Sequence, residues 1–359
     1  MIIHGGNIYE LAAHAGCSPD DILDFSASIN PLGPPPGLAE IISRRVRRLE
    51  SYPDIHNRFL IEAISKFHQI DPEYITVANG STELIYWLPR ALEIKKALVA
   101  LPTFGEYVKA FELHGTSLRK LFSMPENLFQ PKAQDLETAL RNDVFEAVLL
   151  THPASPSGSL LDSDAVDMIV ENSASGRAFF IIDEVFIDFC EQASLKRFLH
   201  RSQNMALIRS FTKFFGLPGL RLGYLLAHPS VAAKVRNYLP PWSVNTLAQA
   251  AGAYCLTQDQ YRSRTVELVA KERQRLADEL SAIGGLEVFP AQANFVLVRM
   301  DRRLMPASRL KREIFERDRI LIRDCGSFEG LDDWYFRAAV RLPDQNDRLI
   351  SALRHALND

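Results

Sequence analysis

The sequence is poor in cysteine and has no long apolar run, and each absence excludes a class of protein. The four cysteines, Cys17, Cys190, Cys255 and Cys325, are scattered, which gives neither a disulfide framework nor a zinc-binding spacing and favours a reducing compartment. A membrane-spanning helix needs a run of about 18 apolar residues, and a secretory signal needs a basic and then an apolar segment. Neither pattern occurs, so we expect a cytoplasmic protein with no membrane partner and no metal site.

A strong net charge is also absent. The 41 Lys and Arg residues nearly balance the 44 Asp and Glu residues, for a formal charge of −3. This balance gives no general attraction to phosphate backbones. The basic run RRVRR at residues 44–48 is interpreted as a solvated helix face. We therefore expect no nucleic-acid partner.

Short apolar runs alternate with helix-length amphipathic stretches over the first two thirds of the chain. Such runs occur near residues 97, 146, 178, 205 and 222. The alternation predicts an α/β fold whose mostly parallel sheet is covered by helices on both faces. After about residue 255, a long charged helix and a few apolar runs predict a smaller α+β domain. We divide the chain into an N-terminal arm that adds to the small domain (1–45), a large domain (46–250) and a small C-terminal domain (251–359).

Lys213 lies in the stretch RSFTKFFGLPGLRLGY, residues 209–224, directly after one of these runs. Lysines are rarely buried, so this one needs a charge partner or a chemical role, although a lone lysine is more often an ordinary amine. Ser210 and Arg221 lie nearby in the sequence, and a hydroxyl and a guanidinium could together hold a phosphate beside the amine. The arrangement suggests a Schiff base with pyridoxal 5′-phosphate (PLP).

Three further motifs supply groups that such a site needs. Asp183 ends the run FFIID and could keep the pyridine ring protonated, although an aspartate that caps a helix is an equally good interpretation. In VANGSTELI the amides of Gly80, Ser81 and Thr82 can point at a phosphate from a helix start, as a plain N-cap also would. Phe104 could stack on the ring or be an ordinary core residue.

In order and spacing, these motifs resemble those of the fold-type-I PLP enzymes, the aspartate aminotransferase superfamily. The resemblance implies a PLP-dependent transferase fold, with Lys213 and Asp183 as catalytic residues. The tetrad SYPD at residues 51–54 resembles the histidinol-phosphate aminotransferase branch, in which this tyrosine reaches the cofactor of the neighbouring subunit. Tyr52 is therefore expected to bind the cofactor phosphate across a homodimer with shared active sites.

The N-terminal segment HGGNIYELAAHAGCSPDDILDFSASINPLG resembles the opening of the threonine-phosphate decarboxylases of cobalamin biosynthesis. PWSVNTLA, ILIRDC and YFRAAVR are similar too, so the resemblance runs from about residue 4 to residue 355. It implies a lyase that converts L-threonine O-3-phosphate into (R)-1-amino-2-propanol O-2-phosphate. By position, it implies that Arg337 pairs with the substrate carboxylate and that His4, Asn30 and Arg323 surround the substrate phosphate.

Two positions depart from the pattern of the superfamily. Ser155, in THPASPSG, replaces the asparagine that contacts the ring oxygen of the cofactor. Phe186, in DEVF, replaces a tyrosine that aminotransferases often have, a change also typical of the decarboxylase group. We expect Ser155 to contact the cofactor and the missing donors to raise the pKa of the Schiff base.

Three other functions stay open at this point. A histidinol-phosphate-type aminotransferase would use the same apparatus to remove the Cα proton. A decarboxylase could instead prefer L-serine O-phosphate, because one methyl group in a pocket contributes only about 1–3 kcal/mol to discrimination. The chain could also keep the fold as a binding or regulatory protein, because fold does not ensure function.

Overall fold

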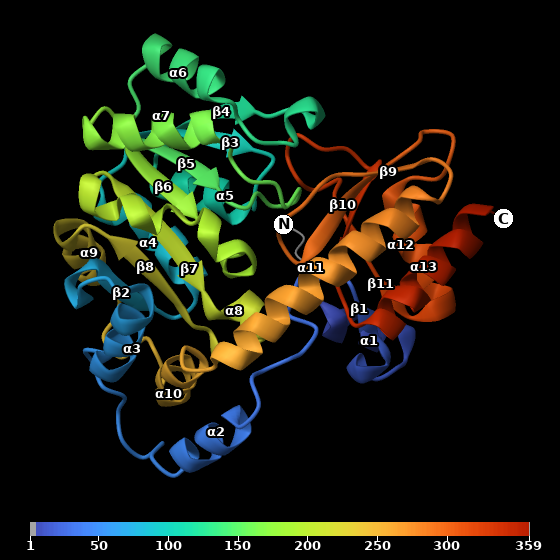
Figure 1. Cartoon of the computed structure of the whole chain (residues 1–359), viewed down its shortest axis with the longest axis horizontal. Helices are drawn as coiled ribbons and strands as arrows, with labels where there is room; N and C mark the ends of the chain where they lie inside the picture. Colours follow the sequence, from blue (N-terminus) through green and yellow to red (C-terminus); the bar gives the residue numbers. More distant parts are fainter. Residues whose placement is uncertain (1–4, 359) are drawn as a thin grey trace.

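The computed structural model describes residues 5–358. A large sheet of seven strands lies on one side of the molecule and a smaller sheet on the other (Figure 1). In the large sheet the strand order is β2-β8-β7-β6-β5-β3-β4. Its strands are β2 (Ile75–Ala78), β3 (Lys96–Leu101), β4 (Ser117–Phe122), β5 (Ala147–Thr151), β6 (Phe179–Asp183), β7 (Met205–Ser210) and β8 (Gly223–Ala227).

The large sheet is parallel except for β8, which runs antiparallel to both of its neighbours. Each of the five apolar runs forms one of its strands, so the predicted mostly parallel α/β sheet is confirmed. Successive side chains of a strand point to opposite faces, and both faces here are apolar: along β3, Leu98 packs on one face and Val99 on the other. Both faces are therefore buried under helices.

Different helices cover the two faces of the large sheet. On one face lie α4 (Ser81–Ala91), α5 (Glu106–Leu113) and α9 (Pro229–Arg236). On the other lie α3 (Arg58–His68), α6 (Ala133–Asn142), α7 (Ser163–Ala174) and α10 (Thr246–Cys255). Also on this second side are α2 (Leu38–Val46) and the one-turn helix α8 (Phe211–Phe214). In the basic run after α2, Arg47 and Arg48 are exposed.

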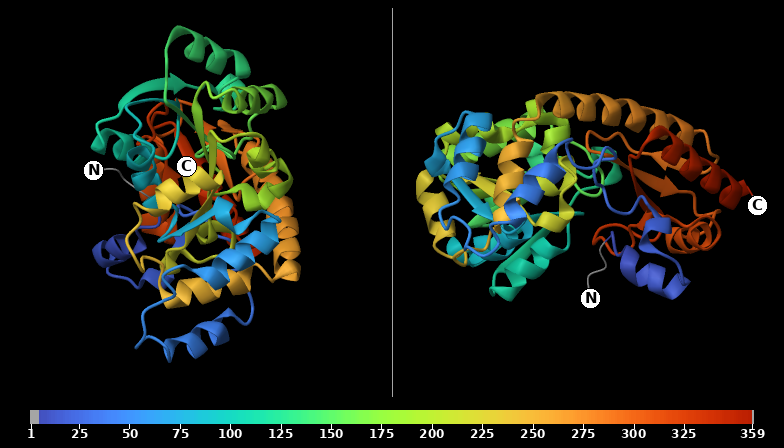
Figure 2. Two further views of the ribbon diagram at one scale, coloured as in Figure 1. Left: turned by 90° about the vertical axis from the view of Figure 1, so that its left-hand side faces the viewer. Right: turned by 90° about the horizontal axis from the view of Figure 1, so that it is seen from below.

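The smaller sheet is antiparallel, in the order β12-β13-β10-β9. Its strands are β9 (Leu286–Val288), β10 (Phe295–Met300), β12 (Arg323–Asp324) and β13 (Tyr335–Ala339). The helices α11 (Asp259–Ser281), α12 (Ala307–Asp318) and α13 (Pro343–Asn358) pack against it. The long helix α11 bridges the two parts of the molecule in both views that show it along its length (Figures 1 and 2).

The N-terminal segment joins the smaller part of the molecule. After α1 (Ile8–Ala15), the strand β1 (Leu23–Asp24) pairs in parallel with β11 (Ile320–Leu321). Phe25 is buried in the core that α11, α12 and α13 share with the smaller sheet. Residues 23–25 thereby reach the same region as the last hundred residues of the chain, while the numbered domain boundaries stay a prediction.

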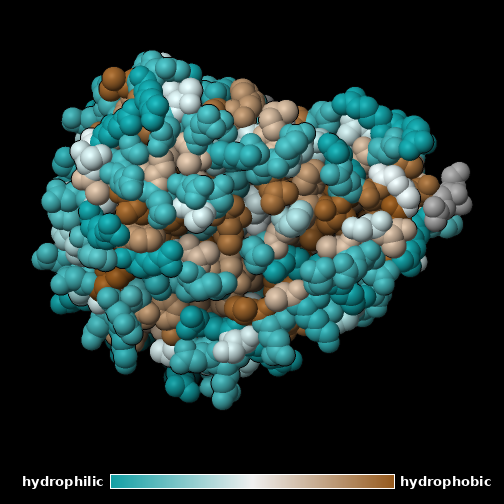
Figure 3. All heavy atoms as spheres, turned by 45° about the horizontal axis from the view of Figure 1, so that its top comes forward, coloured by the Kyte–Doolittle hydropathy of each residue, from teal (hydrophilic) through white to brown (hydrophobic). Residues whose placement is uncertain are grey.

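The surface is mostly hydrophilic on the face drawn in Figure 3, where apolar residues gather toward the middle of the view. Within residues 5–358, no helix has the length and apolar character needed to cross a membrane.

Candidate active site

A cavity of about 250 Å³ lies between the large sheet and the smaller one. The ends of β6 and β7 and the start of α4 form one side of it, and β12, β13 and the N-terminal segment form the other. It is lined by Gly5, Ser26, Ala27, Ser81, Thr82, Ile85, Phe104, Gly105, Ser155, Asp183, Val185, Phe186, Ser210, Thr212, Lys213, Arg221, Arg323, Ser327, Phe328 and Arg337. Carboxyl ends of parallel strands are the usual place for ligands in such sheets.

Lys213 enters the cavity from α8, because β7 ends one turn earlier. Ser210 is the last residue of β7, and its Oγ accepts a hydrogen bond from the Thr212 amide at 3.1 Å, which starts the short helix. The amine of Lys213 lies 5.7 Å from the ring centre of Phe186. Burial first, and then the cations of Arg337 and Arg221, lower the pKa of Lys213 to about 8. A minor fraction of this amine is therefore neutral near pH 7, far more than for an ordinary lysine.

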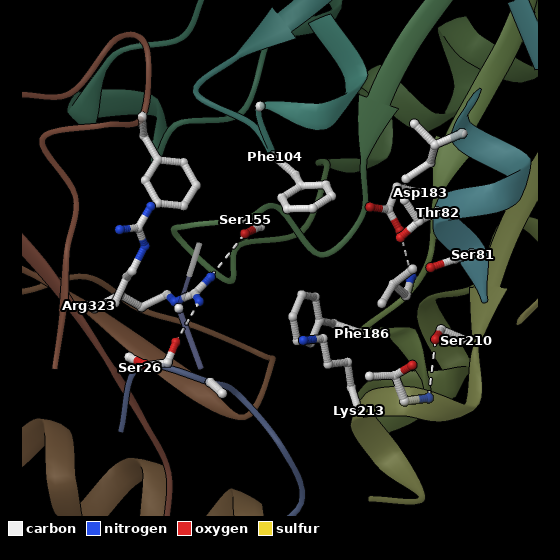
Figure 4. A pocket seen from close by; sticks show the side chains of 18 of the residues that line it. Ser26, Ser81, Thr82, Phe104, Ser155, Asp183, Phe186, Ser210, Lys213 and Arg323 are labelled. Carbon is white, nitrogen blue, oxygen red and sulfur yellow. Dashed lines mark hydrogen bonds between the residues drawn. The ribbon is translucent and has the colours of Figure 1, made fainter. Parts of the chain in front are cut away.

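Asp183 is the last residue of β6 and faces the same cavity (Figure 4). Its Oδ1 accepts a hydrogen bond from the Val185 amide at 2.8 Å. Burial raises the pKa of Asp183 to about 6, against the opposing effect of this bond. Desolvation disfavours the charged form of the carboxylate. A cationic group placed against Asp183 would offset this penalty and would itself be stabilised by the negative charge.

The start of α4 offers an anion-binding site. Gly80 is the N-cap of α4, with φ +80°, and it has no side chain to accept a hydrogen bond from the first amides of the helix. Ser81 and Thr82, the first two residues of α4, line the cavity. A Cβ at Gly80 would lie 2.5 Å from Nη2 of Arg221, so only glycine allows the guanidinium to approach. A helix N-terminus beside a guanidinium suits a phosphate group.

Two buried arginines of the small sheet form the opposite side of the cavity. Arg323 and Arg337 are paired in the register of β12 and β13. Nη1 of Arg337 donates to Ser155 Oγ at 3.1 Å and Nη2 to the Ser26 carbonyl at 3.3 Å. Nη2 of Arg323 donates to Ser327 Oγ at 2.6 Å. Burial lowers the pKa of Arg337 to about 10, so this guanidinium is charged and enclosed.

Aromatic rings lie between these two sides. In Figure 4, Asp183, Ser81, Thr82 and Ser210 are on one side, Arg323, Ser26 and Ser155 on the other, and Phe104, Phe186 and Lys213 between them. Phe104 is therefore a cavity residue, although it also meets Tyr107 edge-on at 6.3 Å between ring centres. The space beside these rings suits a planar aromatic group.

The structure brings ten of the fourteen predicted site residues to this cavity, and of the other four, Gly80, Tyr52 and Asn30 lie outside its lining. Gly80 lies just behind Ser81. Tyr52 is 81% exposed and contacts Trp242, with ring centres 4.8 Å apart. His4 lies outside the described residues. Asn30 is buried away from the lining: its amide donates to the Phe214 carbonyl at 2.7 Å and to two side-chain hydroxyls.

The substrate contact expected of Asn30 stays a prediction, and in the structure this residue has partners within the protein. Its backbone N–H donates to the Lys213 carbonyl at 2.9 Å, and its side-chain amide holds the end of α8. The hydrogen-bonding capacity of this amide is used within the protein. Asn30 therefore braces the segment that carries Lys213.

Several cavity residues were not predicted from the sequence. Ser26 and Ala27 arrive through the pairing of β1 with β11, and Gly5 packs where a Cβ would lie 2.4 Å from the Ser26 carbonyl oxygen. Ser327 and Phe328 follow β12, and the Phe328 ring lies 5.2 Å from the guanidinium carbon of Arg323. The only signal for this side was the resemblance of the HGGN segment and of ILIRDC and YFRAAVR, because the pairings that bring these segments together span hundreds of residues.

Comparison with known proteins identifies the family. A family model described as aminotransferase class I and II matches residues 20–353. The chain belongs to this family. Among aminotransferase class I and II proteins, the threonine-phosphate decarboxylase of Salmonella typhimurium is 36% identical over 356 residues, which cover 99% of this chain and 96% of that protein.

Solved structures of two related proteins share the fold. The histidinol-phosphate aminotransferase of Clostridium acetobutylicum has a TM-score of 0.87 and 30% identity, covering 94% of this chain and 99% of that one. The L-threonine-O-3-phosphate decarboxylase of Porphyromonas gingivalis has a TM-score of 0.83 and 25% identity, covering 94% of this chain and all of that one. Shape therefore places both activities on the same scaffold and does not separate them.

Proposed function

We propose that this chain is a PLP-dependent decarboxylase that converts L-threonine O-3-phosphate into (R)-1-amino-2-propanol O-2-phosphate and carbon dioxide in cobalamin biosynthesis. The observation that carries the proposal is the pair of buried arginines, Arg323 and Arg337, opposite the lysine in one cavity. A substrate with both a phosphate and a carboxylate matches two such cations. The 36% identity to a threonine-phosphate decarboxylase over nearly the whole chain supports the same function.

The cavity fits PLP at each of its functional groups. The amides that start α4, together with Ser210 and Arg221, suit the phosphate, and the Gly80–Arg221 contact leaves no room for a Cβ. Lys213 has the neutral amine that a covalent bond to the aldehyde requires. Phe104 and Asp183 suit the ring face and the ring nitrogen. When bound, PLP supplies an aromatic ring that accepts the electron pair of the bond that breaks at Cα.

The residues of the chain divide the remaining work between them. Asp183, ionised beside a ring nitrogen, keeps that nitrogen protonated. Arg337 would hold the substrate carboxylate and thereby fix the orientation of the Cα–carboxylate bond. Arg323 and Ser327 hold the substrate phosphate. After carbon dioxide leaves, the Lys213 ammonium donates the proton that replaces it at Cα.

We further propose a homodimer in which Tyr52 contributes to the cofactor site of the partner subunit. Tyr52 is directed away from its own cavity and is 81% exposed. Its ring contacts the exposed ring of Trp242. Four further exposed apolar side chains lie close to it in the sequence, namely Val46, Leu49, Ile55 and Phe59. Such a gathering of apolar side chains on a surface is typical of an interface. The free cysteines suit the reducing conditions of the cytoplasm, where we place the protein.

Product analysis tests the proposed function. Purified protein with PLP and L-threonine O-3-phosphate, but without any 2-oxo acid, should release carbon dioxide and the amino-propanol phosphate. Lys213→Ala is the control that should release neither. Formation of glutamate from 2-oxoglutarate and histidinol phosphate, without release of carbon dioxide from the threonine phosphate, would instead establish an aminotransferase like that of Clostridium acetobutylicum. Faster decarboxylation of L-serine O-phosphate would change the proposed substrate and leave the proposed reaction unchanged.

A further inference from the structure

A buried ion pair lies directly behind the cofactor side of the cavity. Glu184 follows Asp183 at the end of β6, and Arg209 precedes Ser210 at the end of β7. Nη1 of Arg209 donates to Oε2 of Glu184 at 2.8 Å, and both side chains are 0% exposed. Neither lines the cavity. We call these two residues the Glu184–Arg209 pair.

The pleat of the strands explains this placement. Alternate residues of β6 and β7 face opposite sides of the sheet. Ile181 and Ile208 pack with the helices on one face, whereas Ile182 and Leu207 pack with those on the other. By the same alternation, Asp183 and Ser210 face the cavity, and the Glu184–Arg209 pair faces the opposite layer. The pair therefore joins the two strands one residue away from each cofactor group.

Three further hydrogen bonds hold Glu184 in place at the ends of the two strands. The Glu184 amide donates to the Ile208 carbonyl at 2.9 Å, which extends the ladder between β6 and β7 beyond Asp183. The Glu184 carboxylate also accepts from the Leu195 amide at 2.7 Å and from Ser194 Oγ at 2.8 Å. These two donors belong to the segment that crosses behind the strands.

Further charge surrounds Arg209. Its Nη2 also forms ion pairs with Glu191 and, at 3.5 Å, with Asp188. These carboxylates raise the pKa of Arg209 well above its ordinary value despite complete burial. A buried ion pair is weak evidence for stability, since apolar residues of similar volume are often as stable. Its use is better sought in geometry.

We infer that the Glu184–Arg209 pair is a positioning pair for the PLP site. By clamping the ends of β6 and β7 together, it sets the separation of Asp183 and Ser210. Through α8, whose N-cap is Ser210, it also sets the place of Lys213. The inference rests on the proposed function only through the cofactor, because the residues it aligns are those that suit PLP.

Glu184→Gln tests this inference, because glutamine keeps the shape and the bond from the Leu195 amide but removes the charge that Arg209 requires. Glu272→Gln is the matched control. Glu272 is buried in α11, its Oε2 accepts from Arg275 at 2.8 Å and from Asn346 at 2.9 Å, and it is not part of the cavity lining. Both variants lose a buried charge–charge interaction, but only one of them lies behind the cofactor residues.

PLP affinity and the visible absorbance of the bound cofactor as a function of pH are measured for both variants. Glu184→Gln should weaken PLP binding about tenfold, as expected for loss of a coupled contact, and should displace the pH midpoint of the absorbance. Glu272→Gln should change only the thermal midpoint. Wild-type affinity and absorbance in Glu184→Gln would overturn the inference, since the pair would then be merely structural.

A second variant covers the case in which Glu184→Gln does not fold. The double variant Glu184→Met with Arg209→Met replaces the pair by apolar groups. Glu191 keeps its ion pair with Lys196, and Asp188, whose pKa is raised by burial, can take up a proton. It should fold and bind PLP weakly. Wild-type PLP affinity in this variant, or failure of both variants to fold, overturns the positioning role. Wild-type protein that binds PLP without releasing carbon dioxide would contradict the proposed function and leave this inference standing.

Discussion

Two buried arginines of this molecule, Arg209 and Arg337, differ in where their counter-charge comes from. Arg209 is 0% exposed, and three carboxylates, those of Glu184, Asp188 and Glu191, form ion pairs with it. Arg337 is 8% exposed, but its partners are the Ser155 hydroxyl and a backbone carbonyl. No acidic side chain of residues 5–358 forms an ion pair with Arg337. The Nε atoms of both arginines are buried without a hydrogen-bond acceptor there, so the carboxylates alone make the difference.

This difference separates a residue that holds the fold from a residue that awaits a ligand. The carboxylates raise the pKa of Arg209, whereas burial lowers that of Arg337 to about 10. An enclosed charge without a built-in counter-charge is unfavourable for the protein alone. Its presence in a cavity is therefore an argument for an anionic ligand. Five predictions follow from this comparison, from the largest expected effect to the smallest.

Replacing Arg337 should cost activity and not stability. For Arg337→Met we expect kcat/KM to fall about a thousandfold, because truncating one partner of a buried charge pair costs several kcal/mol. The thermal midpoint of the protein without cofactor should stay the same or rise, because an uncompensated charge has been removed. Decarboxylation kinetics and thermal unfolding measure the two effects. A large loss of stability would show that Arg337 supports the fold instead.

Replacing Arg209 alone should do the opposite. For Arg209→Met we expect the free energy of unfolding to fall by about 3 kcal/mol or more, since the buried carboxylates lose their partner. Denaturant unfolding of the protein without cofactor measures it. An unfolding free energy equal to that of the wild type would mean that the ion pairs of Arg209 do not stabilise the fold.

Asp183→Asn should stabilise the protein without cofactor while abolishing turnover. The folded-state pKa of Asp183 is raised from 3.8 to about 6, so the folded state binds this proton more tightly than the unfolded chain does. Stability therefore falls as pH rises from about 4 to 6 and stays lower above that range. Near pH 7.5, Asn should increase the free energy of unfolding by about 2 kcal/mol. The gain should vanish near pH 4, which unfolding at both pH values checks.

The pH dependence of cofactor attachment should follow the Lys213 amine. Burial and two nearby guanidinium groups lower its pKa to about 8, and only the neutral amine attacks the aldehyde. The rate of covalent PLP attachment should therefore rise about tenfold between pH 7 and pH 9 and then level off. Removing the Arg337 cation should move the midpoint to higher pH. Arg275→Met serves as the control, because that guanidinium pairs with Glu272 and Asp347, is not part of the cavity lining and is not among the charges that shift the pKa of Lys213.

Removing the Ser155 hydroxyl should have the smallest effect. Ser155 accepts one hydrogen bond from Arg337 at 3.1 Å, so Ser155→Ala should free one guanidinium N–H and loosen its orientation. We expect kcat/KM to fall about threefold, the effect of one neutral hydrogen-bond partner. Ser327→Ala is a useful companion, since Ser327 accepts the equivalent bond from Arg323. An effect as large as that of Arg337→Met would mean that Ser155 touches the reacting atoms.

The side of the cavity on the large sheet could be predicted from the sequence because its signals are local. Lys213, Ser210 and Asp183 each come just after an apolar run, and parallel strands bring such positions to one edge. The turn at Gly80 that starts α4 is likewise recognised from a stretch of about five residues. The antiparallel direction of β8 was not predicted, because an apolar run carries no information about its direction in the sheet.

The side on the small sheet depended on contacts between distant residues. Ser26 and Ala27 meet Arg337 only because β1 pairs with β11 across about three hundred residues. For Asn30 the resemblance implied a contact with the substrate phosphate, and only the structure shows that its side-chain partners within the protein are Phe214, Tyr261 and Thr265. No pattern within a short window could separate these outcomes.

The sequence by itself determined the α/β sheet, the resemblance to PLP enzymes and the chemical identity of Lys213 and Asp183, because periodicity and residue type act over short distances. Only the tertiary structure decided which buried charges are satisfied by the protein and which are left for a ligand. That decision depends on whether a carboxylate from another element arrives within a few ångströms, which burial and strand pairing fix. The resemblance singled out Arg337 and not Arg209, but only the folded structure shows that Arg209 has carboxylate partners and that Arg337 has none among residues 5–358.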